Sequence, residues 1–212
     1  MVYFCQECGY ESSKWMGQCP GCKAWNSFAE EPVFTGKKAS GGGKSVSRQQ
    51  SEPVILKEIS LKEDERQTTK IGELDRVLGG GIVPGSLVLV GGDPGIGKST
   101  LVLQTVLRLP EKKILYVSGE ESARQLKLRA DRIRHNSSDC LIACETSLEQ
   151  IYVNIKNTQP DLVIIDSIQT ISTETIDSSP GSLVQVRECS ASILKFAKQT
   201  NTPVILIGHI NK

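Results

Sequence analysis

The sequence predicts an α/β fold, with a mostly parallel central sheet flanked by helices and preceded by a small four-cysteine ribbon. After about residue 60, short apolar runs rich in β-branched residues alternate with helical patterns. This alternation is typical of a parallel sheet covered on both faces. Before residue 35, four cysteines and both tryptophans are concentrated in a stretch too short to build a stable hydrophobic core.

Composition divides the 212 residues into three regions and limits the function classes. We expect the ribbon at residues 1–35, a flexible linker at residues 36–59 and the α/β core at residues 60–212. Residues 36–52 read GKKASGGGKSVSRQQSE, which favours a flexible linker over an ordered surface loop. Lys and Arg total 25 against 24 Asp and Glu, so any nucleic-acid-binding surface must be a local patch.

Membrane and secretory signals are not recognisable in the sequence. No segment approaches the roughly 20 apolar residues that span a bilayer, and the N-terminus lacks a basic start followed by an apolar run. A cytoplasmic location without a membrane partner is therefore the expectation. Because that compartment is reducing, we do not expect the 7 cysteines to form disulfides.

Buried strands and amphipathic helices are expected in alternation along the core. The strand candidates are residues 87–90, 114–117, 141–143, 162–165 and 204–207. Helices are expected at residues 100–109, 122–134 and 183–198. In the second helix, the residues expected to face the core are Ala123, Leu126, Ala130 and Ile133. In the third helix, they are Val186, Ile193, Leu194 and Ala197.

Residues 92–99 fit G-x-x-x-x-G-K-[ST] at every fixed position, between an expected strand and an expected helix. A glycine-rich turn with a chance lysine is the alternative. The predicted nucleotide-binding residues are Gly92, Asp93, Pro94, Gly95, Ile96, Gly97, Lys98, Ser99 and Thr100. Backbone N–H groups surround phosphate in such a P-loop, Lys98 reaches the β- and γ-phosphates, and the Ser99 hydroxyl is a ligand for Mg²⁺. No guanine signature of the form Asn/Thr-Lys-x-Asp is present, which favours ATP over GTP.

Three further residues follow expected strands and complete a candidate catalytic site. Asp166 ends an apolar strand and is predicted to hold Mg²⁺ together with Ser99. Glu120 is the candidate base that activates water, with Glu121 as the alternative. His209 follows the last strand, where it could sense the γ-phosphate or a partner, although a lone histidine is more often structural.

Two Cys-x-x-Cys pairs, formed by Cys5, Cys8, Cys19 and Cys22, are separated by 10 residues. This spacing predicts a structural Zn²⁺ site with four thiolate ligands. Redox-active thiols are the alternative. Metal binding on the order of 10 kcal/mol would supply the folding energy of so short a ribbon. Cys140, Cys144 and Cys189 lie in the core and are expected to be ordinary buried thiols.

The chain resembles the RadA/Sms family. Residues 4–9 and 14–26, which include both cysteine pairs with Trp15 and Trp25, are similar to the zinc finger of that family. The sequences LDRVLGGG at 74–81 and PGS at 84–86 are similar to its approach to the P-loop. The resemblance implies a RecA-like ATPase core in which Glu120 is the water-activating glutamate. It also implies that His209 couples the nucleotide state to DNA contacts.

The resemblance further implies a DNA-dependent ATPase of repair by homologous recombination. It would process branched intermediates by ATP-driven translocation on single-stranded DNA as a hexameric ring, with recombinase or replication proteins as possible partners. The chain ends at Lys212 without the Lys-Asn-Arg-Phe-Gly motif or the Lon-protease-like domain of the family, and is expected to be a fragment. A nucleotide-gated DNA- or helicase-binding module without turnover is the alternative. A third hypothesis is a KaiC-like regulatory ATPase, and the zinc finger argues against it.

Two candidate DNA contacts stay open. The basic residues Arg124, Lys127, Arg129, Arg132 and Arg134 are interpreted as the solvated face of a helix in preference to a phosphate-binding surface. In the finger, Lys14, Lys23, Trp15 and Trp25 could combine charge with base stacking, or the aromatic rings could pack against the finger or a partner.

Overall fold

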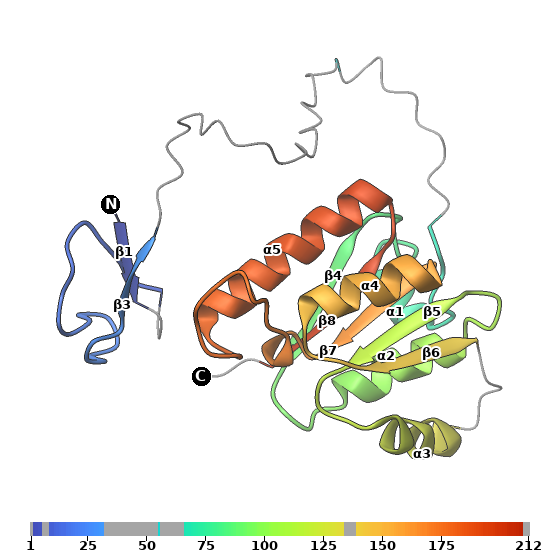
Figure 1. The fold of residues 1–212 in the computed structure, drawn as a ribbon. Helices are drawn as coiled ribbons and strands as arrows, with labels where there is room; N and C mark the ends of the chain where they lie inside the picture. The colour runs from blue at the N-terminus through green and yellow to red at the C-terminus, as the bar shows by residue number, and fades with distance from the viewer. Residues whose placement is uncertain (1, 6–8, 32–54, 56–65, 134–138, 210–212) are drawn as a thin grey trace. The chain divides into compact units, whose positions relative to one another are not determined.

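The computed structural model describes residues 2–5, 9–31, 55, 66–133 and 139–209, which fall into two compact units (Figure 1). Residues 2–5 and 10–31 belong to the first unit and residues 66–209 to the second. Apart from Ile55, the expected linker at 36–59 lies outside the described residues. No helix within these described ranges combines the length and the apolarity needed to cross a bilayer.

The first unit contains a three-stranded antiparallel sheet in the order β2-β1-β3. Its strands are β1 (Val2–Cys5), β2 (Glu11–Ser12) and β3 (Phe28–Glu31). Cys5 at the end of β1 pairs with Phe28 at the start of β3, and both side chains are buried. The register therefore places a cysteine from the first pair inside the unit.

The second unit contains a parallel sheet in the order β4-β8-β7-β5-β6 (Figure 1). The strands are β4 (Leu87–Gly92), β5 (Ile114–Ser118), β6 (Cys140–Cys144), β7 (Leu162–Asp166) and β8 (Val204–His209). Each of the five expected strands is present, and each pairing between them is parallel. The predicted α/β class is confirmed.

Helices cover both faces of this sheet. The helices are α1 (Gly72–Val77), α2 (Lys98–Leu107), α3 (Ala123–Ile133), α4 (Leu148–Thr158) and α5 (Leu183–Thr200), with a short 3₁₀ helix η2 (Ile168–Thr170) after β7. α4 and α5 pack on one face, against Leu115, Val163 and Leu206, while α2 and α3 pack on the other, against Tyr116, Ile164 and Ile205 (Figure 1). Alternate residues of the strands thus enter two separate cores, because successive side chains of a strand point to opposite faces.

Two α-helices of the second unit, α1 and α4, were not predicted, and α4 is the longer. Ser147 caps α4 by accepting a hydrogen bond from the N–H of Gln150, and Leu148, Ile151 and Ile155 are buried at helical spacing. This capped pattern is visible in the sequence and could have identified the helix.

Three burial predictions were wrong. Leu194 is 37% exposed, because Cys189, Ile193 and Ala197 form the buried face of α5. Ala123 is exposed at the start of α3, where it precedes the buried Leu126. Cys144 is exposed because β6 lies at the edge of the sheet, whereas Cys189 is buried as expected and Cys140 is partly buried. Burial raises the pKa of both the Cys140 and the Cys189 thiols to about 11, so these thiols are poor nucleophiles near neutral pH.

Candidate functional site

Four neighbouring strands end at one edge of the parallel sheet. Three of these ends carry a predicted site residue, and Glu120 follows the fourth. Gly92 at the end of β4 is in register with His209 at the end of β8. Ser118 at the end of β5 is in register with Asp166 at the end of β7. The carboxyl edge of a parallel sheet is where open α/β folds bind ligands. Residues from distant parts of the sequence therefore meet at a position suited to a binding site.

The loop between β4 and α2 is exposed and has the backbone conformation of a phosphate cradle. Gly95 and Gly97 have φ angles of 79° and 102°, in the left-handed region that favours glycine. A Cβ atom at either glycine would meet no atom within 4 Å, so the space above the loop is open. Gly97 is the N-cap of α2, which directs the N-terminal end of that helix toward the loop.

Lys98 is the first residue of α2 and lies at the centre of the site, with 7% of its surface exposed. Its Nζ atom donates hydrogen bonds to the carbonyl oxygens of Gly92 at 2.8 Å and Asp93 at 2.9 Å. The same atom lies 3.1 Å from Nδ1 of His209. Backbone oxygens thus hold the ammonium group beside the P-loop and against the end of β8.

A continuous set of polar contacts extends from Lys98 to the end of β7. Nε2 of His209 lies 3.3 Å from Oε1 of Glu120, which follows β5. That same carboxylate oxygen accepts a hydrogen bond from the Ser167 hydroxyl at 2.6 Å. The structure therefore joins Lys98, His209, Glu120 and Ser167 in one network, although they lie on four different segments.

Asp166 lies at the floor of the site and is 4% exposed. Its Oδ2 atom accepts a hydrogen bond of 2.6 Å from the hydroxyl of Tyr116, a residue of β5. Burial, followed by the charge of Asp166, raises the pKa of Tyr116 far above its ordinary value. The phenol therefore remains protonated and holds the carboxylate in a fixed orientation.

The two neighbouring glutamates differ in their surroundings. Glu121 forms an ion pair of 2.5 Å with Arg129 of α3, and its backbone N–H donates to the Ser118 hydroxyl. Glu120 instead faces His209 and Ser167, and 44% of its side-chain surface is exposed. Only Glu120 of these two acids contacts the network that contains Lys98.

Gly119 places Glu120 by allowing a close approach between two loops. A Cβ atom at Gly119 would lie 1.9 Å from Oγ1 and 2.5 Å from Cβ of Thr170. The backbone N–H of Gly119 also donates to the carbonyl oxygen of Asp166 at 2.9 Å. No larger residue can occupy this position without moving the segment after β5 away from the segment after β7.

We therefore expect Gly119→Ala to lower the free energy of unfolding by about 1–3 kcal/mol, as overpacking does in folded interiors. Urea unfolding followed by circular dichroism would measure the change. Gly72→Ala is the matched control, because a Cβ atom at Gly72 meets nothing within 4 Å. Equal unfolding midpoints for the two variants would contradict the steric role of Gly119.

Gln169 and Thr170 of η2 were not predicted as site residues. Nε2 of Gln169 donates to the carbonyl oxygen of His209 at 3.0 Å. Oγ1 of Thr170 donates to the carbonyl oxygen of Ser167 at 2.8 Å. Their position three and four residues after the strand-ending Asp166 is a sequence signal that could have identified them.

The basic face of α3 is partly neutralised by neighbouring acids. Lys127 pairs with Asp131, and Arg129 pairs with Glu121. Arg124 and Arg132 are exposed, and Arg134 lies outside the described residues. This pattern fits the interpretation of a solvated helix face.

A groove of about 710 Å³ lies between α4 and α5, with Tyr152, Lys156, Lys195 and Phe196 among its lining residues. It contains none of the predicted site residues. The candidate site lies instead where the strand ends converge.

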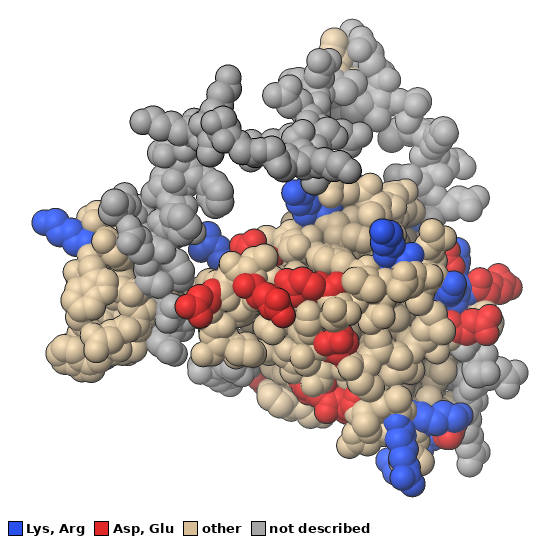
Figure 2. All heavy atoms as spheres, in the orientation of Figure 1, with Lys and Arg blue, Asp and Glu red and all other residues tan. Residues whose placement is uncertain are grey.

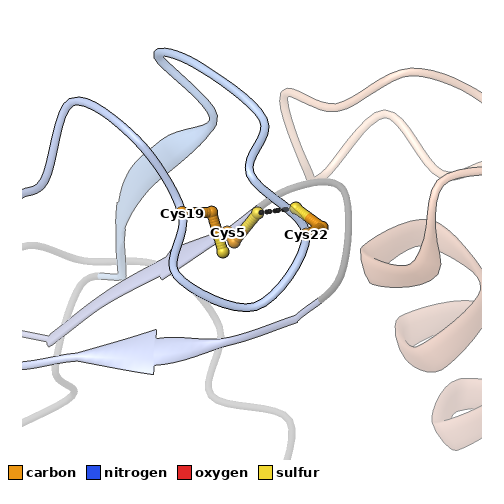
Figure 3. A group of neighbouring side chains, drawn as sticks. All are labelled: Cys5, Cys19 and Cys22. Atoms are coloured by element: carbon orange, nitrogen blue, oxygen red, sulfur yellow. Dashed lines mark hydrogen bonds between the residues drawn. The ribbon is translucent and has the colours of Figure 1, made fainter.

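The first unit contains a cluster of thiols (Figure 3). The Sγ atoms of Cys5, Cys19 and Cys22 all lie within 4.8 Å of one another, with Cys5 and Cys22 at 3.6 Å. Thiolates bound to one tetrahedral Zn²⁺ at about 2.3 Å would be about 3.8 Å apart, so this geometry suits a shared metal. Cys8, the fourth predicted ligand, lies outside the described residues.

Comparison with known proteins agrees with both units. The sequence model of the AAA domain family matches residues 51–212, more than half of the chain. DNA repair protein RadA of Halalkalibacterium halodurans is 50% identical over 214 residues, covering 99% of this chain and 46% of the relative. The chain belongs to the RadA family of AAA domain proteins. RadA of Bacillus subtilis is 47% identical over 216 residues, with the same shares covered.

The resemblance to the RadA family expected from the motifs is therefore confirmed, and the chain spans about half the length of these relatives. The sequence model of the rubredoxin metal binding domain matches residues 3–30, which identifies the first unit of this RadA family chain as a zinc ribbon. The KaiC-like protein of Pyrococcus horikoshii has a similar structure, with a TM-score of 0.57 and 22% identity, covering 68% of this chain and 70% of its own. That likeness concerns the fold, and it confirms the RecA-like core.

Proposed function

We propose that this chain binds ATP with Mg²⁺ at the carboxyl edge of its parallel sheet and hydrolyses it in the service of DNA repair. The observation that carries the proposal is the network from Lys98 through His209 to Glu120, beside the buried Asp166. A cation at a phosphate cradle, a strand-end acid and a second acid that faces the same space are the groups that phosphoryl transfer to water requires.

The P-loop residues bind and orient the phosphates. Backbone N–H groups of residues 92–97 and the N-terminal end of α2 attract the negative charge. Lys98 contacts the β- and γ-phosphates, and Thr100 extends the binding set into the first turn of α2. Ser99 and Asp166 would hold Mg²⁺, which when bound neutralises charge between the phosphates.

Glu120 is proposed to orient and deprotonate the attacking water. Its carboxylate is partly exposed and already positioned by the Ser167 hydroxyl and His209. Glu121 is a weaker candidate because its carboxylate is paired with Arg129. A general base must lie within hydrogen-bonding reach of the water and retain an available lone pair, and Glu120 meets that requirement better.

His209 is proposed to couple the nucleotide to more distant contacts. Its two ring nitrogens lie beside Lys98 and Glu120, so a change at the γ-phosphate would alter both contacts. Because β8 ends at His209, a movement of this side chain would reach the segment that follows the strand. The proposed coupling is between the hydrolysis state and DNA contacts.

The DNA-related part of the proposal is supported by the RadA relatives, which are named as DNA repair proteins. We propose that the whole protein acts on single-stranded or branched DNA in recombination, by branch migration or translocation, as a hexameric ring. Recombinase or replication proteins are the proposed partners. These activities are assigned to the whole protein because the chain spans 46% of each relative.

ATP turnover measured with and without single-stranded DNA tests this function. We expect Mg²⁺-dependent release of phosphate that rises when single-stranded DNA is added, and loss of release when EDTA removes the metal. A chain that binds ATP but releases no phosphate under any of these conditions would be a nucleotide-gated binding module, contrary to the proposal.

We further propose that the metal of the first unit is Zn²⁺, held by Cys5, Cys8, Cys19 and Cys22. Metal analysis should find about one Zn²⁺ per chain, and Cys19→Ser should lower that content at least about tenfold because a buried ligand is lost. Cys144→Ser is the matched control, since Cys144 lies in the sheet of the second unit. Unchanged zinc in the Cys19 variant would contradict the ligand assignment.

A further inference from the structure

Both tryptophans of the chain lie on the surface of the first unit. Trp15 is 55% exposed and Trp25 is 72% exposed. The buried positions of this unit are taken by other residues, among them Cys5, Cys19 and Phe28. Large aromatic side chains dominate the energetics of cores and interfaces, and a pair left outside the core indicates a surface that binds something. The rings therefore do not serve as the core of the finger.

The two indole rings border the same glycine. A Cβ atom at Gly17 would lie 3.9 Å from Cη2 of Trp15 and 3.9 Å from Cζ3 of Trp25. A short hairpin fixes this arrangement, because Gln18 forms a bridge with Trp25 and the N–H of Asn26 donates to the carbonyl oxygen of Gly17 at 2.8 Å. Both rings therefore lie close to residue 17 on the surface of this unit.

Positive charge accompanies this aromatic surface. Lys14 directly precedes Trp15, and Lys23 lies two residues before Trp25. Both lysines are exposed. Figure 2 shows blue lysine atoms projecting from this unit beside tan atoms. The surface is therefore suited to a partner that is both aromatic and anionic.

We propose that Trp15 and Trp25 form a stacking surface for the unpaired bases of single-stranded nucleic acid, with Lys14 and Lys23 contacting its phosphates. Stacking on exposed aromatic rings together with basic side chains is how proteins bind single strands without reading sequence. Duplex DNA fits less well, because its bases are already stacked within the helix. The inference rests on the proposed action on DNA and assigns part of that binding to the zinc ribbon.

Intrinsic fluorescence of the full chain provides a direct test, because the only two tryptophans lie on this surface. Titration with a single-stranded oligothymidylate should quench the emission in a saturable manner. A duplex of equal length should quench less than half as much at the same concentration. Quenching that is equal for the duplex and the single strand, or absent for both, would overturn the proposal.

Variants separate stacking from charge. Trp15→Ala and Trp25→Ala should each weaken binding of the oligonucleotide about 5- to 150-fold, as measured by fluorescence anisotropy of a labelled strand. The corresponding Phe variants should recover most of the affinity, since phenylalanine also stacks. Replacing Lys14 by alanine should reduce the salt dependence of binding by about one phosphate contact. A zinc content equal to that of the wild type shows that the ribbon is folded in each variant.

If both Ala variants bind the single strand with the affinity of the wild type, the proposal is overturned. The rings would then form a surface that binds another protein. ATP turnover without DNA, measured on the same samples, keeps this outcome distinct from failure of the proposed function. Turnover should be equal in the wild type and in the Trp variants, whose side chains lie outside the nucleotide site. An inactive wild type that still shows quenching would contradict the ATPase proposal alone.

Discussion

Replacing Lys98 by alanine is expected to lower the rate of ATP hydrolysis at least about 100-fold. The ammonium group is held by the carbonyl oxygens of Gly92 and Asp93 beside the phosphate cradle, and no other cation contacts those oxygens among the described residues. Removing it leaves the charge that develops on the γ-phosphate without its positive partner, and preorganised charges of this kind are among the largest contributions to catalysis. Phosphate release by the full chain, saturated with ATP and Mg²⁺, measures the effect.

The control for this variant is Lys195→Ala. Lys195 is an exposed residue of α5 that lines the groove against α4, away from the network at the strand ends. The Lys195→Ala variant should hydrolyse ATP at a rate within about twofold of the wild-type rate, because surface substitutions away from a site have small effects. Turnover of the Lys98 variant at the wild-type rate would refute the assignment of the P-loop.

Glu120→Gln is expected to reduce turnover about 100-fold or more while leaving ATP binding nearly unchanged. General base catalysis contributes factors of about 10² to 10⁴. The glutamine side chain retains the shape of glutamate and an oxygen that accepts the Ser167 hydrogen bond, so the local structure is preserved. Only the ability to accept a proton from water is lost. Binding of a fluorescent ATP analogue and phosphate release, measured on the same samples, separate the two effects.

Glu121→Gln is the matched comparison on the neighbouring residue. This change weakens the ion pair with Arg129, which is partly exposed and therefore contributes little to stability. Turnover should stay within about threefold of the wild type. If instead the Glu121 variant is inactive and the Glu120 variant is active, the water-activating residue has been assigned to the wrong glutamate.

Elements with a strong local pattern could be predicted from the sequence. The five strands are short apolar runs, and those of β5 and β7 are buried along their whole length, as expected for the interior of a parallel sheet. Edge positions were less predictable. Leu141 and Ile142 of β6 are partly exposed because no strand follows β6 in the sheet order. An apolar run does not say which strand lies at the edge.

The P-loop motif, the cysteine spacing and the identity of each strand could be predicted, because they depend on residues close together along the chain. Which side chains meet follows from the folded arrangement. Lys98 contacts His209 across 111 positions, and His209 contacts Glu120 across 89. Strand order and register bring these residues together, and both depend on how helices and strands bury their apolar faces against one another. The different surroundings of Glu120 and Glu121 likewise depend on contacts with β8 and α3, which no local spacing specifies.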